Sequence, residues 1–262
     1  MSVISNTKQN LRLQRNSKNI FIRNIVSLVY ITWSLFNNFR RFFVDQNYRS
    51  ILLMQLFNSK NVHQTTSLTF MDRYPVIFSA AKEYFGDKNI KMLSYGCSTG
   101  EEVMTLRKYF TNSRIIGADV NKSSLAICKK LTVDDKISFI YSTTSELEKH
   151  GKYDAIFCMA VLQRKPHHIK ETGITNLKHI YPFDKFEKQI IELDRLLKPG
   201  GLLVIHYSQY SLLDTILSSK YKVYGDYNQN DYASPIFDKN GKMKPTGTPQ
   251  NSIFIKKDFP TR

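Results

Sequence analysis

Short apolar runs alternate with amphipathic helical patterns through the middle of the chain. The runs of strand length cover residues 92–95, 115–119, 137–141, 153–159 and 202–207. Apolar residues recur at helical spacing from Glu101 onward, again from Tyr74-Pro75 to Phe85, and most regularly over Phe183–Leu197. Strands that alternate with helices in this way predict a parallel sheet covered by helices on both faces.

The C-terminal third predicts the edge of this sheet. Lys220–Tyr224 and Ile253–Lys256 are candidates for a final antiparallel pair of strands, and Leu212–Leu217 is a candidate helix. Residues 225–251 are rich in turn-forming residues and predict a loop over a substrate cleft. The expected fold class is therefore α/β, a doubly wound, mostly parallel seven-stranded sheet with a helical extension at the N-terminus.

A turn of small residues joins the first strand to the first helix of this sheet. Gly96-Cys97-Ser98-Thr99-Gly100 ends at Glu101, where the helix begins, and the second strand ends 19 residues beyond Gly100, at Asp119. A nucleotide-binding βαβ unit places a carboxylate on the ribose hydroxyls at about this spacing. We interpret the small residues as leaving room for a ligand at the backbone, and we predict a bound cofactor that contains a nucleoside.

The charge at the helix start narrows the choice of cofactor. A dinucleotide seats its pyrophosphate on the helix N-terminus after G-x-G-x-x-G. This turn lacks the third glycine, and Glu101-Glu102 would repel a pyrophosphate. Two acids suit a ligand that carries positive charge, such as an amino group beside a sulfonium.

The glycine turn, Asp119, the strand Tyr153–Met159 and the run LLKPGGLLVIHYS (196–208) together resemble class I methyltransferases that use S-adenosylmethionine (SAM). The resemblance implies the Rossmann-like methyltransferase fold over residues 64–262 and SAM as cofactor, with residues 1–63 forming a basic helical extension. The residues that it assigns to the cofactor are Arg73, Gly96, Ser98, Thr99, Gly100, Glu101, Asp119, Val120, Thr143, Thr144, Cys158 and Met159.

Within that superfamily, STGEE (98–102), FCMAVL (157–162) and LKPGG look most similar to the CheR-type methyltransferases. In that family an arginine ahead of the domain meets the cofactor carboxylate, and TFMDRYPVIF (69–78) offers Arg73 for this role. The chain departs from the CheR pattern where a substrate would bind. Met159-Ala160, Arg164, Tyr207 and Gln209 replace CheR-type residues, so methylation of a receptor glutamate does not follow.

Methyl transfer requires mainly that the nucleophile of the acceptor is aligned with the methyl group. A general base is needed only where the nucleophilic group has a high pKa. Tyr207, just past the fifth strand, is the candidate catalytic side chain, with packing over the cofactor as its other interpretation. His167-His168 lie in a basic loop, where solvated histidines are the simpler interpretation than a base or a ligand pair. We expect no metal site, and we interpret the three cysteines as the reduced thiols of a cytoplasmic protein.

The basic charge is concentrated near the N-terminus. The chain carries a net charge of +16, and residues 1–60 contain nine Lys/Arg against one acid, Asp45. Between Arg23 and Arg40 lie sixteen uncharged residues, which is short for a spanning helix of about 20 apolar residues. A core helix, an interfacial helix and an anchor all remain open, so peripheral membrane contact through residues 20–58 is one expectation.

The sequence therefore predicts a SAM-dependent methyltransferase whose acceptor is unidentified. A small or glycan-like acceptor is favoured over protein, and nucleic acid is disfavoured because no motif combines aromatic and basic residues for RNA. The alternatives are a CheR-type protein carboxyl methyltransferase and a protein of the same fold without catalysis.

Overall fold

The computed structural model describes residues 19–57, 62–65 and 68–258. The chain divides into two compact units between Leu52 and Leu53. The sequence analysis places the domain boundary later, between residues 63 and 64. His63 explains the difference, because its buried ring packs within the second unit. Its Nδ1 lies 2.6 Å from the Tyr181 hydroxyl and its Nε2 lies 3.2 Å from Gln189 Oε1.

The first unit contains helix α2 (Ile20–Val44) and the start of α3 (Gln46–Phe57). Asn19 caps α2, since its side chain accepts a hydrogen bond from the Phe21 N–H. Asp45 ends α2 and begins α3, because its carboxylate accepts from the Tyr48 N–H at 2.9 Å. The predicted helical extension is therefore present in the described residues.

The second unit is built around a seven-stranded sheet. Its strands are β1 (Lys91–Tyr95), β2 (Arg114–Asp119), β3 (Ile137–Tyr141), β4 (Tyr153–Met159), β5 (Leu197–His206), β6 (Tyr221–Val223) and β7 (Ile253–Lys256). The order across the sheet is β3-β2-β1-β4-β5-β7-β6. Strands β1 to β5 pair in parallel, and β7 runs antiparallel to both β5 and β6. This confirms the predicted doubly wound, mostly parallel sheet.

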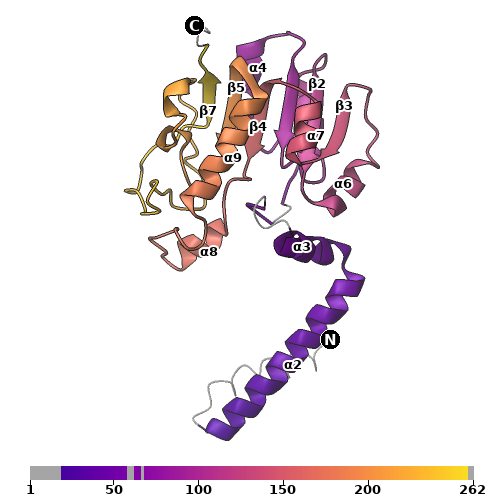
Figure 1. Ribbon diagram of the computed structural model, residues 1–262, viewed down its shortest axis with the longest axis vertical. Coiled ribbons are helices and arrows are strands. Elements are labelled where there is room, and N and C mark those ends of the chain that lie inside the picture. Colours follow the sequence, from indigo (N-terminus) through magenta and orange to yellow (C-terminus); the bar gives the residue numbers. More distant parts are fainter. Residues whose placement is uncertain (1–18, 58–61, 66–67, 259–262) are drawn as a thin grey trace. The chain divides into compact units, whose positions relative to one another are not determined.

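Helices cover both faces of the sheet (Figure 1). They are α4 (Pro75–Phe85), α5 (Glu101–Tyr109), α6 (Lys122–Cys128), α7 (Thr144–Lys149), α8 (Pro166–Glu171) and α9 (Phe183–Leu196). One core joins α7, α8 and α9 to one face, and a second joins α4, α5 and α6 to the other. Successive residues of a strand alternate between these cores, as Ile156 and Phe157 do. Burial on both faces explains why the central strands read as continuous apolar runs.

The segment after β5 differs from its prediction. Within Leu212–Leu217 the structure has one 3₁₀ turn, Leu212–Asp214, and a second one, Ser218–Lys220, follows this segment. The Thr215 hydroxyl donates to the Leu212 carbonyl at 2.7 Å, and the Ser211 hydroxyl accepts from the Leu213 N–H at 3.2 Å. These side chains compete with helical bonding of the backbone, so the predicted helix was wrong.

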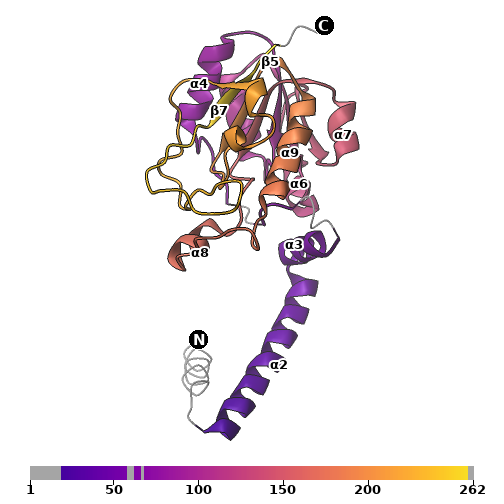
Figure 2. The same cartoon turned by 60° about the vertical axis from the view of Figure 1, so that its left-hand side comes forward.

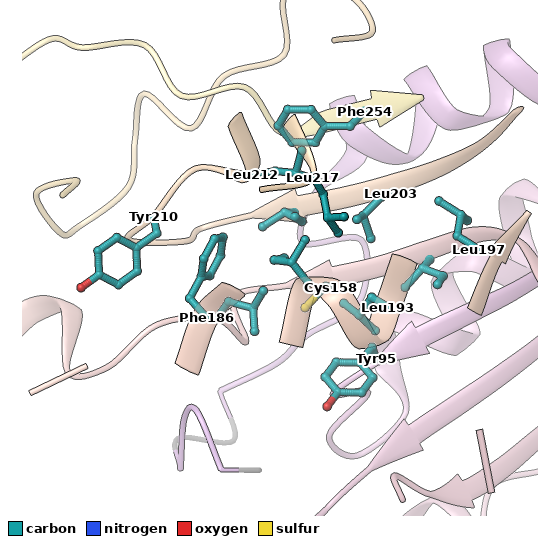
Figure 3. Packing of buried hydrophobic residues seen from close by; sticks show 14 of the residues in the cluster. Tyr95, Cys158, Phe186, Leu193, Leu197, Leu203, Tyr210, Leu212, Leu217 and Phe254 are labelled. Carbon is teal, nitrogen blue, oxygen red and sulfur yellow. The ribbon is translucent and has the colours of Figure 1, made fainter. Parts of the chain in front are cut away.

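The core over α9 is rich in aromatic rings (Figure 3). Phe186 is fully buried, with its ring 5.6 Å from that of Tyr210 and 5.8 Å from that of Phe183. The turn-rich region after β5 runs past the end of α9 in the rotated view (Figure 2). The apolar side of the amphipathic pattern over residues 183–197 is therefore buried in this core.

Phe186→Ala should lower the free energy of unfolding by about 3–5 kcal/mol, because it leaves a cavity the size of a phenyl ring. Urea unfolding followed by circular dichroism measures the change. Lys188→Ala, on the exposed face of the same helix, is the control and should change it by about 0.5 kcal/mol or less. Equal effects of the two substitutions would contradict the assignment of the buried face.

Candidate active site

The carboxyl ends of β1, β2 and β4 open into a cavity of about 950 Å³, including its mouth. The order of strands reverses between β1 and β4, and ligands of doubly wound sheets bind at such a switch point. Residues after each strand line the cavity, among them Gly96, Asp119 and Met159.

Backbone geometry and packing both require glycine at two positions of the turn after β1. Gly96 and Gly100 have φ of +79° and +100°, which residues with a Cβ rarely adopt. A Cβ on Gly96 would lie 2.4 Å from Val161 Cγ2, and one on Gly100 would lie 2.7 Å from Leu131 Cδ1. The sequence analysis attributed both glycines to the approach of a ligand. That approach stays a prediction, and the contacts with Val161 and Leu131 are a second reason for glycine at these positions.

Asp119 joins this turn to the end of β2. Its Oδ2 accepts from the Ser98 N–H at 2.8 Å, and its Oδ1 accepts from the Asn121 N–H at 2.7 Å. The side chain is buried yet lines the cavity. Burial raises the pKa of Asp119, and the backbone donors oppose that rise. A carboxylate oxygen can accept more than one hydrogen bond, so Asp119 can still receive ribose hydroxyls.

Glu102 points into the cavity beside the first strand. Its Oε1 accepts from the Ser94 hydroxyl at 2.7 Å. Burial raises the pKa of Glu102 to about 8, although the Ser94 hydrogen bond and the charge of Arg73 act in the opposite direction. A cationic group in the cavity would relieve this cost, because it would stabilise the ionised carboxylate. Glu102 was not among the predicted site residues, since the sequence alone did not show which of the two acids faces inward.

Arg73 supplies positive charge at the same cavity. It is half-buried, lines the cavity, and donates to the Leu68 carbonyl at 2.7 Å. Arg73, Glu102 and Asp119 thus present one cation and two carboxylates around a single space. That set matches a cofactor with a carboxylate, an amino group and a ribose, as the predicted SAM has.

Two further features fit a polar ligand. The hydroxyls of Ser98 and Tyr74 line the cavity and are buried without a hydrogen-bond partner among the described residues. Ser98, Ala160 and Tyr207 have positive φ at the ends of β1, β4 and β5. Non-glycine residues rarely adopt this conformation, and such strain clusters at functional sites. The residues present therefore fit the predicted cofactor.

The structure brings half of the predicted cofactor residues to this cavity. Those that line it are Arg73, Gly96, Ser98, Asp119, Val120 and Met159. Those outside its lining are Thr99, Gly100, Glu101, Thr143, Thr144 and Cys158. Contact of the second group with a cofactor stays a prediction.

The local structure explains several of these outer positions. The Thr99 hydroxyl donates to Glu101 Oε2 at 2.6 Å. Thr143 caps α7 by accepting from the Glu146 N–H, and Ser142, one residue earlier, lines the cavity. Cys158 is fully buried in the core below α9, on the opposite face of β4 from Met159 (Figure 3).

A second cavity of about 690 Å³, including its mouth, adjoins the first. Arg73 and Tyr74 line both cavities. The end of β5 contributes His206 and Tyr207, and the loop predicted to cover the cleft contributes Asp226, Tyr227, Asn228, Asn230 and Asp231. The two cavities together provide adjacent spaces for two reactants.

Tyr207 lies in an aromatic stack at this second cavity. Its ring centroid is 4.3 Å from that of His206 and 5.3 Å from that of Tyr232. Its hydroxyl donates to Asp231 Oδ2. Burial and the Asp231 carboxylate raise the pKa of Tyr207, so the phenol stays protonated at neutral pH and is no base. Asp231 is the carboxylate at this position, and sequence reasoning did not single it out from a turn-rich loop.

Other polar residues near β5 have structural roles. Gln209 is fully buried, where its amide accepts from the Arg164 N–H at 2.8 Å and donates to the Arg164 carbonyl at 3.1 Å. Gln209 therefore ties the segment after β5 to the one after β4. His167 and His168 are exposed on α8. In the part of the chain that the structure describes, no cluster of side chains could hold a metal ion.

Glu102→Gln should change how stability depends on pH. An ordinary glutamate in the unfolded chain ionises near 4.5, whereas Glu102 in the folded chain ionises near 8. Between these values the folded state holds the extra proton, so the wild-type protein loses stability as pH rises. The glutamine variant lacks this loss and should melt on the order of 5 °C higher than the wild type at pH 8, with little difference at pH 4.5. Melting curves of the unliganded protein across this range measure the effect.

Glu101→Gln, one residue earlier and outside the cavity, removes the same formal charge and is the control. If the Glu102→Gln and wild-type melting temperatures stay parallel from pH 4.5 to pH 8, Glu102 does not carry the raised pKa.

The chain matches known proteins over most of this unit. Residues 86–241, more than half of the chain, match the family described as "Methyltransferase domain". The tRNA N(3)-methylcytidine methyltransferase trm140 of Schizosaccharomyces pombe is 26% identical over 210 residues, which cover 70% of this chain and 61% of that protein. The malonyl-[acyl-carrier protein] O-methyltransferase of Priestia megaterium is 27% identical over 120 residues, covering 46% and 37%. The chain thus spans less than two thirds of either relative.

Solved structures resemble the chain more distantly. CalS10, an amino pentose methyltransferase from Micromonospora echinaspora determined with SAM bound, aligns with a TM-score of 0.38 and 16% identity over 52% of this chain and 50% of that one. Structural similarity this low does not indicate which acceptor the chain methylates. The match of the family over residues 86–241 agrees with the predicted enzyme class, and the strand order and the cavity fit the predicted cofactor. The chain belongs to the methyltransferase domain family, and its second unit has the class I methyltransferase fold.

Proposed function

We propose that this enzyme methylates a small, hydroxyl- or amine-bearing acceptor, such as a glycan-like molecule, that binds in the second cavity. The observation that carries the proposal is the adjacency of the two cavities, which share Arg73 and Tyr74 as lining residues. A cofactor in the first cavity and an acceptor in the second would meet there. Holding two reactants in an aligned pose is the main contribution that a protein makes to methyl transfer.

The charged residues that line the first cavity suggest a role for each of them in binding the cofactor. Arg73 would hold its carboxylate, Glu102 its amino group and Asp119 its ribose hydroxyls. The sulfonium of SAM supplies the methyl group when the cofactor is bound. Binding of a cation would draw Glu102 into its ionised form, so part of the burial cost at Glu102 is offset only in the loaded enzyme.

The lining of the second cavity supports a neutral or cationic acceptor. Asp226, Asn228, Asn230 and Asp231 offer amide and carboxylate groups, and Tyr227 adds an aromatic ring. Carboxylates and amides form hydrogen bonds with hydroxyls and amines. Two carboxylates disfavour a phosphate in the same space. This chemistry supports the small or glycan-like acceptor over a nucleic-acid backbone.

Asp231 is the group that can accept a proton from the acceptor. Tyr207 remains protonated and donates to one oxygen of Asp231, which orients the carboxylate. With SAM bound as the methyl donor, Asp231 would receive the proton that the acceptor's oxygen or nitrogen releases on methylation. An acceptor that is already ionised would need no such base.

A tRNA acceptor is the second candidate, and the fission yeast relative supports it. That relative is named as a tRNA methyltransferase, and this chain carries a net charge of +16, which favours association with polyanions. The CheR-type alternative stays a prediction from motif resemblance. Its characteristic product would be a methyl ester that base hydrolyses.

Incubation with methyl-labelled SAM and a fractionated lysate of the host tests the proposal. We expect label in the small-molecule or glycan fraction. Label in RNA that falls steeply with salt would instead support the tRNA candidate, and base-labile label in protein would support the CheR-type one. A protein that binds no SAM by calorimetry would exclude every catalytic proposal and leave the fold without this activity.

Asp231→Asn should lower kcat by about 10²–10⁴-fold for a hydroxyl or amine acceptor, because it removes a general base. The affinity for SAM should stay unchanged, since Asp231 lies outside the first cavity. Tyr207→Phe is the control, since it removes only the hydrogen bond to Asp231 and should cost about tenfold or less. Turnover by Asp231→Asn at the wild-type rate would exclude Asp231 as the base.

A further inference from the structure

Helix α2 exposes an unusual amount of apolar surface for a helix of this length. Of its 25 residues, Val26 is the one that is buried. Phe21, Trp33 and Phe36 are 79%, 62% and 63% exposed, and other large apolar side chains along the helix are exposed as well. Isolated exposed apolar residues need no explanation, but a contiguous face of this kind marks an interaction surface.

A polar stripe runs along one side of α2. Its members follow alternating spacings of four and three residues, so they lie on one face of the helix: Arg23, Ser27, Tyr30, Ser34, Asn37 and Arg41. The opposite face carries the large apolar residues, at Phe21, Ile25, Leu28, Val29, Phe36, Phe39 and Phe43. The helix is therefore amphipathic along its whole length of about 38 Å.

Thr32 is the polar residue in the middle of the apolar face, and its hydroxyl is already paired. It lies 3.0 Å from the carbonyls of both Leu28 and Val29, one turn earlier in the same helix. Such bonding lets a hydroxyl enter an apolar environment without an unsatisfied donor. Arg40 lies near the end of the helix, where a long side chain can extend toward water.

The charge on α2 indicates what covers its apolar face. Residues 20–44 contain three arginines and no acid. Asp45, just beyond, pairs with Arg41 at 3.4 Å, but both side chains remain about half exposed. A cationic polar stripe above a wide apolar face matches a membrane surface that contains anionic lipids. A surface buried against a second copy of the chain would face the same three arginines with no acid between residues 20 and 44 to pair them.

We propose that α2 binds anionic lipid membranes as an interfacial helix, with its apolar face in the acyl boundary and its arginines at the headgroups. Among the described residues, α2 is the helix long and apolar enough to cross a membrane. The polar stripe decides against a crossing, because a spanning α2 would carry Ser27, Ser34 and Asn37 through the hydrocarbon. Because α2 is joined to the methyltransferase, membrane binding would hold the enzyme at a lipid surface.

Trp33 makes a direct test feasible, because it is the one tryptophan of the chain and lies on α2. The full-length protein should show a blue shift of Trp33 emission with vesicles of phosphatidylcholine and about 30% phosphatidylserine, and a weaker one with phosphatidylcholine alone. Raising salt from about 50 mM to about 500 mM should weaken the binding. Shallow lipid quenchers should quench Trp33 more than quenchers at the bilayer centre.

Two matched double variants separate the faces of the helix. Val29→Gln with Phe36→Gln places amides on the apolar face and should weaken binding to the mixed vesicles by about tenfold or more. Ser27→Gln with Ser34→Gln places the same amides on the polar stripe and should leave binding within about twofold. Both should bind SAM as the wild type does, so this test is independent of the proposed acceptor.

Three results would overturn the proposal. These are equal binding by the two double variants, quenching of Trp33 mainly from the bilayer centre, and absence of vesicle binding by a protein that light scattering shows to be a dimer.

Discussion

The bridge that Asp119 makes between two backbone N–H groups is the constraint on which the site depends. It ties the turn after β1 to the start of α6, at 2.8 Å from Ser98 and 2.7 Å from Asn121. Without a carboxylate there, two buried donors would have no acceptor, at a cost of about 1–3 kcal/mol each. The same side chain lines the cofactor cavity. One buried acid therefore both shapes the site and offers oxygens to its ligand.

Burial in the cavity disfavours the ionised form of its carboxyl groups. Burial raises the pKa of Glu102 to about 8, and it also raises that of Asp119. Arg73 opposes the first rise without cancelling it. A group that brings positive charge into the space would stabilise the ionised carboxylates, so the electrostatics of the cavity favour a cationic ligand. The preference for a cationic ligand comes from the burial of these acids. The same acids on a solvent-exposed helix would show no such preference.

The acceptor side of the site is built differently. Aromatic rings from β5 and the long loop stack around Tyr207, and hydrogen bonds from buried amides hold the loop in place. Gln229 and Gln250 both donate to the Ser208 carbonyl, at 2.6 and 2.7 Å. Loops vary in sequence more readily than the strands beneath them. The proposed acceptor site therefore lies in the part of the chain that pattern analysis describes least well.

The sequence by itself determined the fold class and the place of Asp119 at the edge of the sheet. Strand-length patterns predicted β3, β4 and β7 with the bounds that the structure has. The signal is strongest for β4, which is almost continuously apolar because both of its faces are buried. The position of Asp119 at the end of β2 is also local information. A parallel sheet brings the ends of its strands to one edge whatever the details of packing.

Tertiary structure alone decided which side chains face the cavities. Glu102 faces inward and Glu101 does not, because successive residues of a helix point about 100° apart and the packing of α5 selects one of them. Cys158 lies in the core while Met159 lines the site, since adjacent strand residues face opposite sides of the sheet. Asp231 reaches Tyr207 across 24 residues of chain. Contacts of that kind depend on how a long loop folds back, and no local pattern encodes them.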